Sequence, residues 1–155
     1  MTANGLQAVR LEFTSAVEML DIVQVVSDHM GRTIGLDEDA VHRVGVAIRE
    51  SVINAIKHGK RHDLYKHVFV EFESAPDGRE PGLMISVRDQ GEGFDPETVA
   101  NPLDAENLLK SSGRGIFLIR NFMDEVVLQR APQGGMEIRM VKRRPARGLS
   151  DTVKT

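Results

Sequence analysis

The sequence contains no cysteine, which excludes disulfide bonds, cysteine nucleophiles and zinc sites built on thiolates. Long apolar runs are also missing, since no segment approaches the ~18–20 consecutive apolar residues of a membrane-spanning helix. Near the N-terminus, Glu12, Glu18 and Asp21 interrupt the stretch in which a signal peptide would need an apolar core. We therefore expect a cytoplasmic protein that does not act at a membrane.

Charge of one sign is not in large excess, because 20 lysines and arginines face 23 aspartates and glutamates and give a net charge of −3. This balance gives no reason to expect direct binding to nucleic acid. It hides an asymmetry: the chain from Lys142 onward carries five basic side chains and one acidic, whereas residues 1–141 carry 15 basic and 22 acidic. We interpret the first part as an acidic body that binds protein partners and the rest as a solvated end.

A length of 155 residues is that of one compact domain. The composition, 41% hydrophobic and 28% charged, is typical of a water-soluble domain with its own core. We predict a domain over residues 6–141, followed by a flexible basic tail over residues 142–155. A sensor or a phosphoacceptor segment would then have to come from other chains.

Hydrophobic periodicity predicts both strands and helices. Alternation of apolar and polar residues predicts strands over residues 6–13, 67–73, 83–89, 125–131 and 136–141. Apolar spacing of three or four predicts helices over residues 15–31, 37–59 and 116–123, the first with Ser15 and Glu18 in a capping box. Turn residues at 76–78 and 132–135 predict two hairpins.

Each predicted strand keeps one polar face, as Glu71 and Glu73 do in the strand over residues 67–73. A sheet with one wet face needs helices on the other face only. The sequence therefore predicts an α+β two-layer sandwich, in which a mixed or mostly antiparallel sheet is covered by helices on one face.

Three short segments carry polar residues suited to chemistry, and the first ends the helix over residues 37–59. Glu50, Asn54 and either Lys57 or His58 are spaced by three or four, so they share a helical face that is not the apolar one. These side chains could act as a proton acceptor, a magnesium ligand and a phosphate contact. The alternative is an ordinary solvated helix face.

The second segment, Asp89-Gln90-Gly91-Glu92-Gly93-Phe94, follows a predicted strand. Alternation directs Asp89 toward the helix-covered interior, where a charge requires a partner. The amino group of a bound base would satisfy this carboxylate, and Gly91 and Gly93 would let the backbone approach a flat ring. The alternative is a strand-terminal aspartate that begins a glycine turn.

The third segment, Ser111-Ser112-Gly113-Arg114-Gly115-Ile116, opens the last predicted helix. Glycines expose backbone N–H groups and a helix start attracts anions, so the segment suits phosphates. It is neither a Walker A loop, which needs Gly-Lys-Ser/Thr, nor the dinucleotide pattern Gly-x-Gly-x-x-Gly. The alternative is a plain helix cap.

Two further regions carry residues that could serve a functional site. The chain from Gly91 to Gly115 is rich in glycine and proline, with one weakly helical stretch over residues 103–109, and a segment of this kind usually has a functional reason. His58, His62 and Asp63 could suggest a metal cluster, but with no further ligands at close spacing we favour a surface loop.

A helix with Glu50 and Asn54, then Asp-x-Gly-x-Gly-Phe, then a long loop, then Gly-x-Gly opening a helix resembles the N, G1 and G2 boxes of the GHKL ATPases, which share the Bergerat nucleotide-binding fold. The resemblance covers residues 6–141. Among these ATPases, the single-domain form and the segments 50–59 and 113–126 are most similar to bacterial anti-sigma factor serine/threonine kinases.

This resemblance implies roles for individual residues. Glu50 would be the general base, and Asn54 would hold the Mg²⁺ that bridges the ATP phosphates, with Lys57 close to the nucleotide. Asp89 would accept a hydrogen bond from the adenine amino group. The neighbouring contacts to the nucleotide would come from Gly91, Gly93, Phe94, Ser112, Gly113, Arg114, Gly115 and Ile116.

The resemblance also implies a lid and partners. Residues 95–112 would close over ATP, and the protein would bind a sigma factor and phosphorylate a STAS-type anti-sigma factor antagonist, working as a homodimer. One position departs from the family, because Ser111 stands where some members carry an arginine that reaches the terminal phosphate. Lys110 and Arg114 are the remaining cations for that role.

Two other functions stay open at the level of sequence. The first is a nucleotide-gated binding module that switches partners without transferring phosphate. The second is a stand-alone ATP-binding domain of a histidine-kinase-type system, which would require phosphoacceptor helices from elsewhere.

Overall fold

The computed structural model describes residues 8–14, 17–59, 67–75, 81–90, 113–132 and 134–145. In chain order the elements are β1 (Val9–Thr14), the 3-10 helix η1 (Val17–Met19), α1 (Leu20–Ile34), α2 (Glu38–Gly59), β2 (His67–Ser74), β3 (Gly82–Asp89), α5 (Gly113–Phe122), β4 (Glu125–Arg130) and β5 (Met136–Arg143). The strands and helices predicted from hydrophobic periodicity are all present, but the start predicted for the first helix is wrong. Residues 17–19 form η1, and α1 begins at Leu20 with Met19 as its N-cap and no side-chain cap, so the predicted capping box does not start it. None of the helices in the described ranges is long and apolar enough to cross a membrane.

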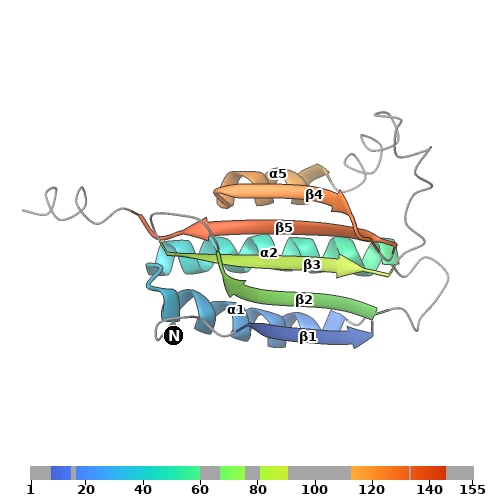
Figure 1. Cartoon of the computed structure of the whole chain (residues 1–155), viewed down its shortest axis with the longest axis horizontal. Helices are drawn as coiled ribbons and strands as arrows, with labels where there is room; N and C mark the ends of the chain where they lie inside the picture. Colours follow the sequence, from blue (N-terminus) through green and yellow to red (C-terminus); the bar gives the residue numbers. More distant parts are fainter. Residues whose placement is uncertain are drawn as a thin grey trace, which may run out of the picture.

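The strands form one sheet in the order β1-β2-β3-β5-β4, and all four pairings are antiparallel. The two predicted hairpins, β2–β3 and β4–β5, are confirmed. Within the described residues, α1, α2 and α5 lie together on one face of the sheet, as Figure 1 shows. The predicted α+β two-layer sandwich is therefore confirmed, and β5, the last strand, is inserted next to β3.

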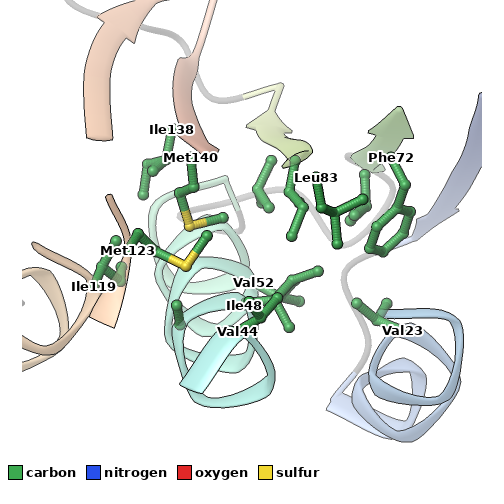
Figure 2. Close-up of a cluster of buried hydrophobic side chains, with 14 of the residues drawn as sticks. Val23, Val44, Ile48, Val52, Phe72, Leu83, Ile119, Met123, Ile138 and Met140 are labelled. Atoms are coloured by element: carbon green, nitrogen blue, oxygen red, sulfur yellow. The ribbon is translucent and has the colours of Figure 1, made fainter. Parts of the chain in front are cut away.

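The core lies between this helix layer and the sheet (Figure 2). Its centre is the apolar stripe of α2, in which Val44, Ile48 and Val52 are buried. Side chains from the sheet and from the chain on either side of α2 pack in the same core cluster as this stripe. They are Val23, Phe72, Leu83, Ile119, Met123, Ile138 and Met140. Because the stripe faces the sheet, the flank of α2 that carries the polar residues is left for other contacts.

Helix α1 ends at Ile34 and not near Gly31, which corrects the sequence prediction. Gly31 lies inside the helix, where a Cβ would stand 3.4 Å from Val41 and 3.5 Å from Leu36. The helix stops at Gly35 because that residue takes a positive φ of 101°, and its N–H donates to the carbonyls of Arg32 and Gly31. Glycine at position 31 thus serves close helix packing.

Helix α2 begins as predicted, immediately after Asp37, whose Oδ1 accepts the N–H of Ala40 at 2.8 Å. The first turn is also tied to α1, since Arg32 donates two hydrogen bonds to the Glu38 carboxylate. The hydrogen bond from Arg32 lowers the pKa of Glu38 below its usual value. Both side chains are exposed, so this ion pair adds little stability to the start of α2, which the Asp37 cap already fixes.

Two elements extend beyond their predicted ends. Helix α5 begins at Gly113, three residues before Ile116, so the Gly-x-Gly segment forms its first turn. Strand β5 continues past Val141 through Lys142 and Arg143. Lys142 is held by the Phe122 carbonyl at 3.0 Å, and the Arg143 N–H donates to Asp124. These two residues of the predicted tail therefore belong to the sheet, whereas residues 146–155 lie outside the described ranges.

Replacing Phe72 with alanine should lower the free energy of unfolding by about 3–5 kcal/mol, because the ring is fully buried beneath the helices and its removal leaves a cavity. Urea titration followed by circular dichroism measures this change. The matched control is Val127→Ala on β4, where the side chain is 48% exposed and the change should stay within about 0.5 kcal/mol. Equal effects at the two positions would contradict this location of the core.

Candidate functional site

The described parts of the three polar segments singled out in the sequence lie toward one end of the molecule. The C-terminal ends of α2 and β3 and the first residues of α5 and β5 all lie at the right-hand end of the sheet in Figure 1. This arrangement follows from the topology, because α5 runs back along α2 and β5 runs antiparallel to β3. The site is therefore built from residues far apart in the chain but fixed by the same packed layers.

The first two functional side chains come from the flank of α2 that faces α5. Glu50 is half-buried, and Asn54, one turn further on, is only 7% exposed. The Nδ2 atom of Asn54 is buried and has no hydrogen-bond partner among the described residues. An amide buried in this way is expensive unless a group from outside the chain completes its hydrogen bonding.

The first turn of α5 lies directly against these two side chains. A methyl group added to Gly115 would stand 3.0 Å from Oε2 of Glu50 and 3.6 Å from Nδ2 of Asn54. Any larger residue at this position would displace the Glu50 carboxylate. The glycine therefore permits the start of α5, with its unpaired backbone N–H groups, to approach a carboxylate and an amide closely.

Asp89 closes the site from the sheet. The last residue of β3 points to the helix-covered face, as alternation predicts, and it is only 3% exposed. Its Oδ1 accepts the backbone N–H of Met136 at 3.3 Å, the first residue of β5. A carboxylate this deeply buried and fixed by the backbone is suited to bind one hydrogen-bond donor in a defined orientation.

The remaining predicted site residues divide into three groups. Lys57 is exposed on the last turns of α2, and Ile116 is half-buried in the first turn of α5, next to Gly115. Gly113 and Arg114 contribute backbone to that same turn. Gly91, Gly93, Phe94 and Ser112, together with the predicted lid over residues 95–112, lie outside the described residues.

A cation next to Glu50 in sequence is directed elsewhere. Arg49 is bonded to Gln24 of α1 at 3.2 Å and lies 3.8 Å from Asp21. It therefore joins the two helices, and it leaves the Glu50 carboxylate to face α5. Sequence reasoning assigned Arg49 no role, and its contact with α1 could not be read from local spacing.

The oxygen atoms of Glu50 and Asn54 suit a magnesium ion that is held mainly by the phosphates of a bound ligand. No group of three or more His, Asp or Glu side chains in the described part of the chain is placed to form a metal cage. Mg²⁺ commonly takes only one or two protein ligands and completes its shell with phosphate oxygens and water. In such a site the amide oxygen Oδ1 of Asn54 would be the metal ligand, and the unpaired Nδ2, an N–H donor, would be free to donate to a phosphate oxygen.

Comparison with known proteins matches most of the chain to one family. The model of the histidine kinase-like ATPase domain matches residues 13–142, which include every element from α1 to β4. The match extends across all three segments of the site and the whole helix layer.

Individual relatives also match most of this chain. The serine-protein kinase RsbW of Staphylococcus epidermidis is 28% identical over 141 residues, covering 86% of this chain and 85% of that protein. The protein of the same name from Staphylococcus aureus is 27% identical over the same length. The crystal structure of the RsbU and RsbW domains of Rv1364c from Mycobacterium tuberculosis has a TM-score of 0.63 at 21% identity. That match covers 92% of this chain but only 34% of the other, and it supports the fold alone.

Proposed function

Because this chain belongs to the histidine kinase-like ATPase domain family, we propose that it is an ATP-dependent serine/threonine protein kinase that also acts as an anti-sigma factor. It phosphorylates a small STAS-type antagonist protein and sequesters a sigma factor until that antagonist displaces it. The observation that carries this proposal is the packing of Gly115, in the first turn of α5, against both Glu50 and Asn54. A potential base, a potential metal ligand and a phosphate-binding helix start thus share one place.

In the proposed reaction, Asp89 accepts a hydrogen bond from the adenine amino group and sets the position of the base. The backbone N–H groups at the start of α5 bind the phosphates, for which the positive end of the helix dipole is suited. The amide oxygen of Asn54 would hold Mg²⁺, which when bound would supply positive charge to the phosphates. Lys57 adds a positive charge at the end of α2.

Glu50 then acts on the protein substrate. The carboxylate accepts the proton of a serine or threonine hydroxyl while the hydroxyl oxygen forms a bond to the γ-phosphorus of ATP. The bond between that phosphorus and the β–γ bridging oxygen breaks, and ADP leaves. The contact with Gly115 keeps Glu50 next to the helix start, where the transferred group is bound.

The proposed partners agree with the charge of the chain. The nucleotide-binding body is acidic, with 22 acidic and 15 basic residues before Lys142, so it is suited to protein partners and not to nucleic acid. We propose that the protein works as a homodimer, as its family resemblance implies. We propose the cytoplasm as its location, since its substrates would be bacterial transcription regulators.

The experiment is transfer of phosphate from γ-labelled ATP to a candidate antagonist, followed by identification of the modified residue. The proposal predicts phosphoserine or phosphothreonine on the antagonist and release of ADP. Label on a histidine would instead support the histidine-kinase reading. Nucleotide binding without transfer to any antagonist encoded beside a sigma factor would overturn the kinase activity and leave a nucleotide-gated binding module.

Replacing Asn54 with alanine should raise the Mg²⁺ concentration needed for half-maximal transfer by about 10–100-fold, since an amide ligand is lost and the fold around it is kept. A magnesium titration at saturating ATP measures the shift. Asn121→Ala is a suitable control, because that exposed asparagine lies on α5 and its amide donates to the Phe117 carbonyl one turn earlier in the same helix. A magnesium requirement unchanged by Asn54→Ala would contradict the assignment of Asn54.

A further inference from the structure

The turn between β4 and β5 touches Asp89, although the sequence assigns it only to a hairpin. Ala131 and Gly135 close this turn through a hydrogen bond of 3.0 Å, and Met136 begins β5 immediately afterwards. The strand register pairs Arg88 of β3 with Glu137, so Met136 stands beside Asp89 in the sheet. The turn therefore reaches the end of β3 that carries the buried carboxylate.

Gly135 makes the closest approach. A Cβ at this position would overlap the backbone carbonyl oxygen of Asp89 and lie 2.7 Å from its Oδ1, distances that real Cβ atoms do not adopt. The residue also has a positive φ of 86°, which favours glycine. The α-carbon of Gly135 is thus packed flat against the aspartate, and the next N–H, that of Met136, donates to Oδ1 at 3.3 Å.

We propose that Gly135 and the Met136 amide are positioning residues that fix the orientation of the Asp89 carboxylate and thereby set selectivity for the 6-amino group of adenine. This inference rests on the proposed function of Asp89. The turn holds the carboxylate from its backbone side by contact and from Oδ1 by a hydrogen bond. A purine with an amino group at position 6 then donates a hydrogen bond to an acceptor held at a fixed angle. A purine without that group cannot make this hydrogen bond to the buried carboxylate and should bind more weakly.

Gly134 provides a matched control for backbone strain. It precedes Gly135 in the same turn and also has a positive φ, 96°, so alanine at either position strains the turn in the same way. Alanine at position 135 must in addition force the turn apart from the backbone carbonyl and the carboxylate of Asp89. Because a hydrogen bond weakens steeply away from its preferred distance and angle, displacing the carboxylate should remove most of what this bond contributes to affinity, about 10-fold or more.

The experiment compares the affinities for ATP and for purine riboside triphosphate, which lacks the 6-amino group, in wild type, Gly135→Ala and Gly134→Ala. Wild type should prefer ATP by at least about 10-fold, as expected for a hydrogen bond to a charged group. Gly135→Ala should reduce this preference by about 10-fold or more and keep its affinity for purine riboside triphosphate. Gly134→Ala should retain the preference for ATP. Equal preference in the two variants would overturn the proposal.

A second measurement keeps the test informative if Gly135→Ala does not fold. Met136→Pro removes the N–H that donates to Oδ1, and proline is tolerated at the first residue of a strand. It should also lower the preference for ATP, and a preference equal to wild type would contradict the role of that amide. Wild-type protein that binds neither triphosphate would instead refute the proposed nucleotide site, so the two failures are distinguishable.

Discussion

Replacing Asp89 with asparagine should weaken ATP binding by about 10–100-fold, the range that loss of a charged hydrogen bond in a buried site produces. The substitution keeps the shape of the side chain but can present an N–H group toward the adenine amino group, so two donors would face each other. Because Asp89 is only 3% exposed, bulk water has little access to compensate for the lost interaction. Isothermal titration calorimetry with ATP measures the change directly.

The control for Asp89→Asn lies on the same strand. Ser86 faces the open side of the sheet in β3, and Ser86→Ala should leave the affinity for ATP unchanged. Unfolding curves of both variants would show whether the fold is intact. Equal ATP affinity in Asp89→Asn and wild type would mean that the base binds elsewhere.

Replacing Glu50 with glutamine should lower the rate of phosphate transfer by about 10²–10⁴-fold, the usual contribution of a general base. The amide has nearly the same size as the carboxylate, so the contact with Gly115 is kept and ATP affinity should change little. Single-turnover transfer to an antagonist separates the chemical step from binding.

The control for Glu50→Gln is Arg49→Gln, one residue earlier. Arg49 contacts α1 and no part of the α5 start in the described structure, so its loss should affect stability more than transfer. A transfer rate in Glu50→Gln equal to that of wild type would remove Glu50 from the mechanism, and a loss of ATP binding would reassign it to the nucleotide.

Local patterns predicted most of the fold. Alternation in β3 placed Asp89 on the buried face, and the spacing in α2 separated the apolar stripe from the flank with Glu50 and Asn54. These predictions succeed because periodicity depends only on neighbouring residues and on which side is buried. The error at Gly31 has the same origin, since a glycine inside a helix and a glycine that ends one look alike until their packing is known.

Contacts between distant segments could not be derived from the sequence. The insertion of β5 beside β3 brings Gly135 against Asp89, and the reversal of α5 along α2 brings Gly115 against Glu50. Neither glycine has a side chain whose chemistry could reveal its partner. The sequence resemblance assigned Gly115 to phosphate, and only the packing shows that the same residue also borders the carboxylate.

The proposed function depends on where the nucleotide binds, and a crystal structure with Mg²⁺ and a non-hydrolysable ATP analogue tests this most directly. We predict the adenine amino group within about 3 Å of the Asp89 carboxylate, as in a normal hydrogen bond. The phosphates should lie over the first turn of α5, between Gly115 and the Asn54 amide. An analogue bound anywhere else, with no contact to the end of β3 or the start of α5, would contradict the proposed nucleotide site.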